Sequence, residues 1–279
     1  MKIDPLAGTL EGVPLPRPST PPDLPRVDLL GMRIDKVTSR DLCTFVFDEL
    51  DQGRGRWCVT ANLDILQRFH RDLAARLLYD AADLRVADGM PLVWASKLLG
   101  EPLPERVAGS DLVPLLAHEA ARRGRSIYLL GGATGAALGA ARVLRERDPD
   151  LKIAGIAAPH FSSPPTRREL APVLEEIARS GASVIFVALG SPKQEWVCAA
   201  IRNRLPRVFC IGVGATFSFL AGQTPRAPVA LQRLGLEWLH RLVTEPRRLF
   251  RRYVIVGLPF ALRLLTHAAT RRFLPSRIE

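Results

Sequence analysis

The chain has 279 residues, of which 47% are apolar, and a formal net charge of +11. This length and apolar content suffice for one large hydrophobic core or two small ones. The cysteines have no CxxC spacing and lie within apolar runs, which predicts buried, reduced thiols in the cytoplasm and not a disulfide framework. They are Cys43, Cys58, Cys198 and Cys210.

Residues 1–26 differ in composition from the rest of the chain. They contain seven prolines and almost no hydrophobic periodicity, so we expect an extended, largely disordered arm. A signal peptide is not expected, because no positively charged stretch precedes an apolar one in this segment.

Short β-branched and aromatic runs alternate with longer amphipathic stretches across residues 27–225. Several runs are continuously apolar, as expected of strands that are buried on both faces of a sheet. This alternation predicts an α/β fold, with a mostly parallel sheet covered by helices on both faces. The expected strands are Trp57–Thr60, Leu84–Ala87, Ser126–Leu130, Lys152–Ile156, Ser183–Leu189 and Arg207–Val213. The expected helices cover residues 64–80, 90–100, 110–123, 135–147, 167–180 and 192–204.

Polar or glycine-rich motifs follow most of these strands directly. In parallel sheets, ligands bind at the carboxyl ends of the strands, so these motifs are the candidate site. Gly131, Gly132 and Gly135 follow one strand and open a helix, where backbone N–H groups and the helix dipole suit a phosphate. The same glycines also suit a plain strand-to-helix turn, and they match neither the dinucleotide fingerprint nor a P-loop.

The other strand ends each allow a functional and a plain interpretation. Asp88 is either a turn residue or a general base that deprotonates a hydroxyl nucleophile. Thr60 and Asn62 are either substrate contacts or a helix entry with Asn62 as the N-cap. Lys193 and Gln194 follow a proline at a helix start and would face a ligand above the sheet.

Metal chemistry and serine nucleophile chemistry have little support in the sequence. The five histidines are scattered without ligand spacing, so we expect no metal site. The chain has no nucleophile elbow of the kind that carries a catalytic serine.

The C-terminal segment, residues 226–279, is basic. It holds eleven arginines, no lysine and three acidic residues, for a net charge of +8. Such a segment attracts phosphate, in nucleic acid or in anionic lipid. The apolar run Val254–Leu262 contains Pro259 and is shorter than the roughly 20 residues that a membrane span needs, so we expect no transmembrane helix.

Helical geometry separates the charges of this segment from its apolar residues. At 100° per residue, the arginines fall on one arc and Leu249, Phe250 and Tyr253 fall opposite. We interpret this as a basic amphipathic helix that binds anionic headgroups, and the alternative is a helix packed on the core with a solvated basic face. The expected membrane-binding residues are Arg247, Arg248, Arg251 and Arg252.

Taken in order, these motifs resemble the WecG/TagA/CpsF glycosyltransferase family. The resemblance runs from about Asp28 to Phe260 and includes the tail block Glu245–Tyr253. The other blocks are Val59-Thr60-Ala61-Asn62, Ala87-Asp88-Gly89-Met90-Pro91, Arg106-Val107-Ala108-Gly109-Ser110-Asp111-Leu112, Leu130-Gly131-Gly132, Gly190-Ser191-Pro192-Lys193-Gln194-Glu195 and Gly212-Val213-Gly214-Ala215. The chain departs from the family pattern at Ala158-Pro159-His160-Phe161.

This resemblance implies a Rossmann-like fold and an inverting transfer of a sugar from a UDP-sugar to a polyprenyl-diphosphate-linked saccharide. It implies no metal or other cofactor, and a peripheral location on the cytoplasmic face of the bacterial inner membrane. Asp88 matches the family's proposed general base, and Arg106 matches an arginine suited to the substrate diphosphate. Thr60, Asn62 and Gln194 match residues beside the substrate pocket. The donated sugar, the acceptor saccharide and the oligomeric state stay open.

Two other classes of protein fit the sequence less well. A Rossmann-type oxidoreductase is disfavoured, since no strand is followed by GxGxxG with an acidic residue about 20 positions later. A nucleic-acid-binding module that uses the basic tail is disfavoured because the core has no RNP-like aromatic motif or helix-turn-helix signal, and only 6% of residues are aromatic.

Overall fold

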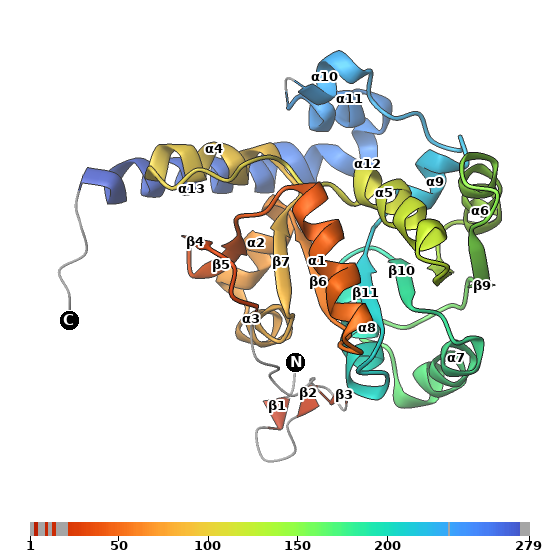
Figure 1. Ribbon diagram of the computed structural model, residues 1–279. Coiled ribbons are helices and arrows are strands. Elements are labelled where there is room, and N and C mark those ends of the chain that lie inside the picture. The colour runs from red at the N-terminus through yellow and green to blue at the C-terminus, as the bar shows by residue number, and fades with distance from the viewer. Residues whose placement is uncertain (1–2, 5–8, 11–12, 15–21, 234, 274–279) are drawn as a thin grey trace.

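The computed structural model describes residues 3–4, 9–10, 13–14, 22–233 and 235–273. Within this part of the chain, six parallel strands form the main sheet, in the order β7-β6-β11-β10-β8-β9 (Figure 1). They are β6 (Trp57–Ala61), β7 (Leu84–Ala87), β8 (Ser126–Gly131), β9 (Lys152–Ala157), β10 (Val184–Ala188) and β11 (Phe209–Gly212). Each lies where the sequence predicts a strand, so the parallel α/β fold is confirmed.

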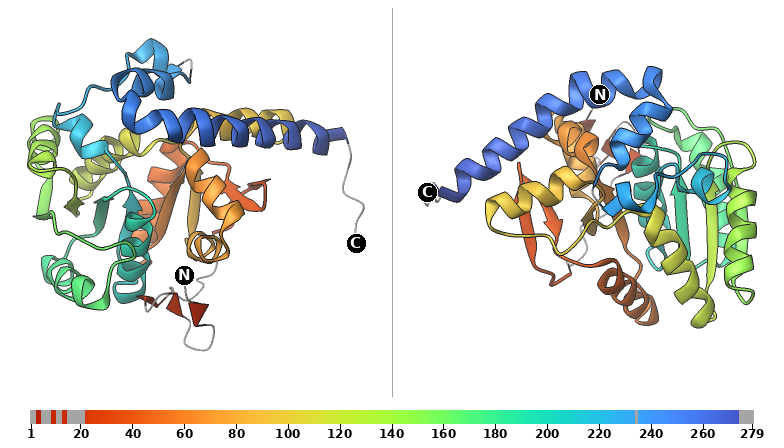
Figure 2. Two further views of the ribbon diagram at one scale, coloured as in Figure 1. Left: turned by 180° about the vertical axis from the view of Figure 1, so that it is seen from behind. Right: turned by 90° about the horizontal axis from the view of Figure 1, so that it is seen from above.

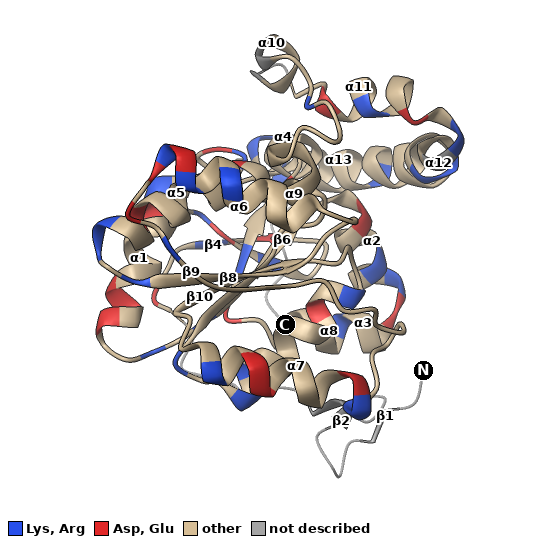
Figure 3. Cartoon of the chain, turned by 90° about the vertical axis from the view of Figure 1, so that its right-hand side faces the viewer, with Lys and Arg blue, Asp and Glu red and all other residues tan. Residues whose placement is uncertain are grey.

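Helices cover both faces of this sheet (Figure 3). One face packs against α2 (Leu63–Arg71), α3 (Leu73–Asp80), α7 (Arg167–Ser180) and α8 (Lys193–Arg204). The other face packs against α1 (Ser39–Asp51), α5 (Gly109–Arg122), α6 (Ala136–Arg147) and α9 (Thr216–Leu220).

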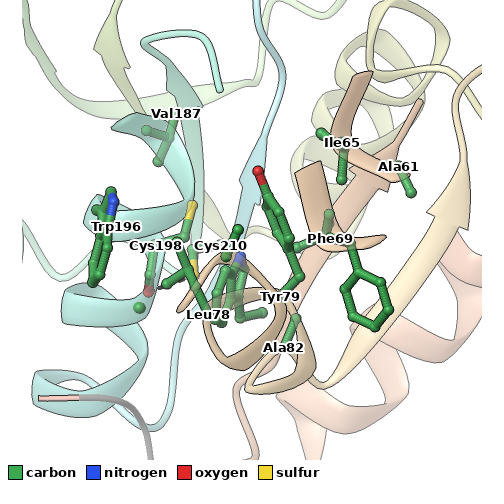
Figure 4. Close-up of a cluster of buried hydrophobic side chains, with 14 of the residues drawn as sticks. Ala61, Ile65, Phe69, Leu78, Tyr79, Ala82, Val187, Trp196, Cys198 and Cys210 are labelled. Atoms are coloured by element: carbon green, nitrogen blue, oxygen red, sulfur yellow. Dashed lines mark hydrogen bonds between the residues drawn. The ribbon is translucent and has the colours of Figure 1, made fainter. Parts of the chain in front are cut away.

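Alternate residues of the strands supply the two halves of the core. In β10, for example, Ile185 and Val187 face the first set of helices, whereas Val184 and Phe186 face the second. Figure 4 shows part of the first half, where Val187 and Tyr79 lie among side chains from β6, α2, α3 and α8. This burial on both faces explains why several of the strands, β10 among them, read as unbroken apolar runs.

The structure refines several of the predicted elements. The helix expected over residues 64–80 is two helices that meet at Asp72, whose carboxylate accepts hydrogen bonds from the N–H groups of Ala74 and Ala75. The hairpin of β4 (Arg26–Leu29) and β5 (Met32–Asp35) and the helix α1 are additions to the prediction. In the N-terminal arm, β1 (Ile3–Asp4), β2 (Thr9–Leu10) and β3 (Val13–Pro14) pair antiparallel. The rest of the expected disordered arm, up to residue 21, lies outside the described residues.

The C-terminal segment is a succession of helices that lies along one end of the core (Figures 1 and 2). It comprises α10 (Val229–Arg233), α11 (Glu237–Thr244), α12 (Pro246–Phe250), the π-helix η1 (Arg251–Gly257) and α13 (Leu258–Phe273). The long helix α13 runs beside α4 (Met90–Leu99) and buries Phe260, Leu264 and Ala268.

One expectation about this segment, that it holds no transmembrane helix, stays a prediction, although the apolar helix is longer than the run Val254–Leu262. Among the described residues, the helix Arg251–Arg272 is long and apolar enough, by length and composition, to cross a membrane, with 22 residues and a mean hydropathy of 1.3. The uncharged run Val254–Leu262 is shorter than this helix. The helix continues through Pro259 and past the single charge of Arg263. A π-helix precedes Pro259, and such an irregular turn is one way in which a helix accommodates a residue that lacks an N–H group.

Candidate active site

The predicted site residues of β6, β7, β10 and β11 meet at the carboxyl edge of the sheet. The Asp88 N–H donates to the Ala61 carbonyl over 2.7 Å, and the Thr60 hydroxyl donates to the Gly212 carbonyl over 2.9 Å. On the far side of β11, the Gly214 N–H donates to Gln194 Oε1 over 3.0 Å. Residues that are up to 152 positions apart in the sequence therefore share one edge, as the parallel topology requires.

Asp88 lies at the end of β7, next to Asn62. It is partly buried, and this burial raises the pKa of its carboxyl group to about 7. Arg106 lowers the same pKa, Glu237 raises it, and the Gly109 N–H donates a hydrogen bond to the carboxylate and lowers it. A carboxyl group that titrates near neutral pH is suited to general-base catalysis, since it is both ionised and able to accept a proton.

Four charged side chains form a ring of ion pairs beside Asp88, which we call the charged ring. Arg106 Nη1 lies 2.9 Å from Glu237 Oε2, and Arg106 Nη2 lies 3.5 Å from Asp111 Oδ2. Arg226 Nη1 lies 2.7 Å from Asp111 Oδ1, and Arg226 Nη2 lies 4.0 Å from Glu237 Oε2. Arg106 and Asp111 belong to the core, whereas Arg226 and Glu237 belong to the C-terminal segment.

Sequence reasoning missed the tail members of this site, Arg226 and Glu237, as well as Arg241. The Arg241 guanidinium stacks on the Phe219 ring, 4.7 Å from its centroid, and its charge lowers the pKa of Asp88. These residues belong to the segment, 226–279, for which the sequence predicts membrane-binding helices. One signal was present: Glu237 is an acidic residue inside an otherwise strongly basic stretch, which indicates a specific cationic partner.

Thr60 and Asn62 have clear structural partners. The hydrogen bond from Thr60 ties the end of β6 to that of β11, and Asn62 caps α2 by accepting from the N–H groups of Asp64 and Ile65, each over 3.1 Å. Both residues lie at the edge of the candidate site. These structural roles do not test whether they contact a substrate, so that contact stays a prediction.

The glycine turn after β8 is required by packing. Gly131, Gly132 and Gly135 have φ angles of 91°, 92° and 74°, which favour glycine. A Cβ atom on Gly131 would lie 2.7 Å from the Ala188 carbonyl oxygen, and the Gly132 N–H donates to that same oxygen over 2.7 Å. The plain interpretation as a tight turn therefore explains Gly131 and Gly132, and phosphate binding by this turn stays a prediction.

Lys193 and Gln194 hold loops of the site in place. Lys193 Nζ donates to the Phe161 carbonyl over 2.6 Å, which fixes the loop after β9. Gln194 is buried, and its Nε2 donates to Glu195 Oε1 over 3.0 Å. Glu195 is only 2% exposed, its Oε2 has no hydrogen-bond partner among the described residues, and burial raises its pKa.

The expected membrane-binding arginines do not all behave alike. Arg247 and Arg251 are exposed, but Arg252 Nη2 lies 3.0 Å from Asp64 Oδ2 on α2. Asp64 also pairs with Arg68, which donates to the Ser191 hydroxyl over 3.1 Å. Arg252 therefore ties η1 to α2, and Arg68 in turn links α2 to Ser191 in the turn before α8. The side chain of Arg248 lies outside the described part of the structure.

The sequence profile of the WecG/TagA/CpsF glycosyl transferase family matches residues 27–273. The chain belongs to this family. It is 33% identical over 199 residues to an N-acetylglucosaminyldiphosphoundecaprenol N-acetyl-β-D-mannosaminyltransferase of Bacillus spizizenii, covering 71% of this chain and 75% of the relative.

Membership in this family identifies the chain as a glycosyltransferase and not a Rossmann-type oxidoreductase or a nucleic-acid-binding module. The match also continues past Phe260, where the resemblance ended, and takes in α13 up to Phe273. The C-terminal helices are therefore part of this WecG/TagA/CpsF glycosyltransferase and not an unrelated appendage.

The cysteines and the residues that could bind a metal ion were also the subject of predictions from the sequence. Cys43, Cys58, Cys198 and Cys210 are buried free thiols, as predicted. Across residues 22–233, 235–273 and the short N-terminal strands, no group of three or more His, Cys, Asp or Glu side chains is arranged to hold a metal ion.

Proposed function

We propose that this glycosyltransferase moves a sugar from a UDP-sugar to a saccharide carried on a polyprenyl diphosphate, with inversion at the anomeric carbon. The observation that carries the proposal is Asp88, a carboxyl group with a pKa of about 7 at the end of a parallel strand, surrounded by arginines. The name of the B. spizizenii relative specifies an undecaprenyl-diphosphate-linked acceptor and a β-linked product. A β-linkage made from an α-linked donor requires inversion.

Asp88 would act as the general base in a single displacement. Its carboxylate takes the proton of the acceptor hydroxyl while that oxygen bonds to the anomeric carbon of the donor. The bond between the anomeric carbon and the diphosphate oxygen breaks at the same time, and UDP leaves with the electron pair. Neutral pH suits this step because about half of the Asp88 carboxyls are ionised near their pKa of about 7.

Positive charge must stabilise the leaving diphosphate. We propose that cationic side chains supply this charge instead of a metal ion. Arg106 lies in the charged ring with its side chain 16% exposed, so that a diphosphate can reach it. Glu237 and Asp111 hold its guanidinium in place beside Asp88. Lys193, at the N-terminus of α8, is a second candidate cation at the same edge of the sheet.

A lipid-linked acceptor requires contact with a membrane, and the C-terminal segment suits that contact. Its helices expose large apolar side chains beside arginines, and Figure 3 shows basic residues gathered around α12. The exposed apolar residues are Trp238, Leu239, Val243, Phe250, Ile255, Leu258 and Leu262. We propose peripheral attachment to the cytoplasmic face of the inner membrane, with Arg247, Arg248 and Arg251 at lipid phosphates.

A donor panel tests the proposal. The purified full-length chain is incubated with several UDP-sugars, with and without a polyprenyl-diphosphate-linked N-acetylglucosamine, and UDP release is measured. We expect release that depends on the acceptor and is lost in Asp88→Asn. Transfer from GDP- or dTDP-sugars alone would show that the donor is wrong, and release that ignores the acceptor would show that the acceptor is wrong.

A further inference from the structure

A chain of hydrogen bonds leads from α2 and α3 to the candidate site, and its centre is the hydroxyl of Ser191 in the turn before α8. Arg68 Nη1 donates to Ser191 Oγ over 3.1 Å, and the hydroxyl oxygens of Tyr79 and Ser191 lie 3.1 Å apart. Asp64 Oδ2 accepts from Arg68 Nη2 over 3.0 Å, which holds the guanidinium in place. Side chains of two helices thus converge on one hydroxyl group of the turn.

The direction of each hydrogen bond to Ser191 follows from the chemistry of its partners. A guanidinium only donates, so the Ser191 oxygen accepts from Arg68. A hydrogen bond from Ser191 lowers the pKa of Glu195, so the Ser191 proton points to that carboxyl group. A hydroxyl has one proton and two lone pairs, which leaves Tyr79 as the second donor to Ser191. These three bonds satisfy the Ser191 hydroxyl completely.

Burial makes this arrangement rigid. Tyr79 is fully buried, and Figure 4 shows it within the apolar cluster, with its hydroxyl at the top of the ring. Glu195 is 2% exposed. Because water does not reach these two groups freely, a lost protein partner would leave a buried polar group unsatisfied. Ser191 is therefore held between partners that have few other ways to form hydrogen bonds.

The chain continues from Glu195 to the carboxyl edge of the sheet. Glu195 Oε1 accepts from Gln194 Nε2 over 3.0 Å, and Gln194 Oε1 accepts from the Gly214 N–H over 3.0 Å. These two bonds decide which way the amide faces, since the flipped amide would turn its oxygen toward a carboxylate and its NH₂ toward an N–H. The amide also packs on Gly212, where a Cβ atom would lie 2.6 Å from Gln194 Nε2. Gln194 thereby fixes the backbone at the end of β11.

The end of β11 contacts the residue that bonds to the proposed base. Val213 packs so closely on Gly109 that a Cβ atom on this glycine would lie 3.3 Å from Val213 Cα. The Gly109 N–H donates to the Asp88 carboxylate and lowers its pKa. A displacement at the end of β11 would therefore move a hydrogen-bond donor of Asp88.

We propose that Ser191 is a positioning residue for sugar transfer. It holds Gln194 through Glu195, and so keeps the end of β11 and Gly109 in place beside Asp88. This inference rests on the proposed function, because it takes Asp88 as the base. It adds a residue that acts on the base through the protein and not through contact with a substrate.

Ser191→Ala in the full-length chain tests the inference. With the lipid-linked acceptor and the donor that the panel above identifies, kcat should fall by about 2–30-fold, the range for changes along a connected network, and KM should stay within about twofold. The pKa of Asp88 is measured separately by carbon-13 NMR of labelled aspartate carboxyls, with Asp88→Asn to assign the resonance. This pKa should rise in Ser191→Ala, because the Gly109 N–H that lowers it moves away. Arg106, Glu237 and Arg241 also affect this pKa and are unchanged in the variant.

Three further variants separate positioning from stability. Ser191→Thr restores the hydroxyl and should recover most of the lost kcat. Tyr79→Phe removes one donor to Ser191 and should shift kcat and the Asp88 pKa in the same direction by less. Ser180→Ala is the matched control: this half-buried serine at the end of α7 donates to the Ile177 carbonyl over 2.7 Å. It should lower the melting temperature while leaving kcat and the Asp88 pKa at their wild-type values.

The outcomes separate this inference from the proposed function. Wild-type kcat and an unchanged Asp88 pKa in Ser191→Ala would overturn the inference and leave Asp88 as the base. A rise in KM alone would also overturn it, because Ser191 would then contact a substrate. Equal changes in Ser191→Ala and Ser180→Ala would reduce its role to stability. If the Asp88 pKa rises in Ser191→Ala but the wild type transfers no sugar, the link from Ser191 to Asp88 stands and the proposed reaction fails.

Discussion

The core and the C-terminal segment are stabilised in different ways. In the core, the strands of the main sheet are largely buried, and α1 and α7 begin with capping boxes at Thr38 and Thr166. In the described part of the C-terminal segment, α11 and η1 bury none of their side chains. Several large apolar side chains there are more than a third exposed, Val243 at 73% among them. The core is thus specified by its own packing, whereas the segment keeps surface available for a partner.

Ion pairs join the two regions at the site. Arg106 of the core pairs with Glu237, Asp111 pairs with Arg226, and Asp64 pairs with Arg252. In each pair one residue lies before position 112 and the other after position 225. The proposed base therefore comes from the rigid sheet, while the charges that surround it come partly from the less densely packed segment. Changes in one region should affect chemistry and changes in the other should affect attachment.

The largest expected effect separates chemistry from binding within the core. Asp88→Asn keeps the shape of the side chain but removes the proton acceptor, so turnover should fall by about 10²–10⁴-fold. UDP-sugar binding and the melting temperature should not fall. The measurement is steady-state turnover at saturating substrates together with calorimetric binding. Near wild-type turnover in this variant would move the role of base to another residue.

Charge reversal in the C-terminal segment should affect attachment. Each arginine near an anionic surface contributes about 1 kcal/mol, so changing Arg247, Arg248, Arg251 and Arg252 to Glu should weaken binding to anionic vesicles at least about 100-fold. Reaction with a long-chain acceptor should slow more than reaction with a short soluble one. Cosedimentation with vesicles of mixed neutral and anionic lipid measures the first effect.

Two control variants make this comparison specific. The same four-fold reversal at exposed core arginines, Arg40, Arg122, Arg142 and Arg145, changes the net charge equally and should leave vesicle binding nearly intact. A triple variant that retains Arg252 preserves its ion pair with Asp64, 3.0 Å away, and should still lose most of the binding. Equal cosedimentation of wild type and all three variants would show that the arginine face is only a solvated surface.

The raised pKa of Asp88 should make turnover and stability depend on pH. Vesicle binding by the C-terminal segment should not depend on this group. Because the base must be ionised, turnover should rise about tenfold per pH unit below the pKa of about 7 and level off above it. The pKa of Asp88 is higher in the folded state than in the unfolded state, so between about pH 4 and 7 the native state binds more protons. The free energy of unfolding therefore falls as the pH rises through this range. Asp88→Asn should therefore gain melting temperature over the wild type at pH 8 more than at pH 5. A flat rate profile between pH 5 and 8 would contradict the assignment.

The sequence predicted the framework of the core well and its buried charges poorly. All strands of the main sheet were found because they are short, mostly apolar runs that alternate with amphipathic stretches. The β4–β5 hairpin was missed because Asp35, which reads as an exposed turn residue, is buried, paired with Arg26 and bonded to the Arg85 N–H. Such pairing depends on tertiary contacts that no local period encodes.

The same limit applies to the site. Asp88 could be predicted because strand ends in a parallel sheet are a known location for ligands. Arg226 and Glu237 could not, since their contacts with Asp111 and Arg106 span more than a hundred residues of sequence. Gly131 and Gly132 had two interpretations, and only the approach of Ala188 shows how strongly packing requires glycine there.

A smaller effect on turnover is expected from changes at Glu195, a buried residue of the core. Its Oε1 accepts from Gln194 Nε2, and Gln194 Oε1 in turn accepts from the Gly214 N–H, so Glu195 orients an amide at the sheet edge. Burial raises the pKa of Glu195, so the isosteric, neutral Glu195→Gln should keep turnover within about fivefold of the wild type. Glu195→Ala should lose about 1–3 kcal/mol of unfolding free energy, measured by denaturant titration, because Gln194 loses its partner. A Gln variant as impaired as the Ala variant would show that the charge itself matters.

The smallest expected effect is that of chelation, and it tests whether cationic side chains replace a metal ion. If Arg106 and Lys193 neutralise the leaving diphosphate together, a divalent cation has no role left at the transition state. Assays of the full-length chain with excess EDTA should then give turnover within about twofold of the untreated enzyme. The informative companion is Arg106→Ala, which removes one of the proposed cations. Added Mg²⁺ or Mn²⁺ should rescue that variant only weakly, since the described residues hold no group of three or more His, Cys, Asp or Glu side chains arranged to bind the ion. Activity of the wild type that disappears with EDTA and returns with Mn²⁺ or Mg²⁺ would show that the cationic side chains position the diphosphate without replacing the metal.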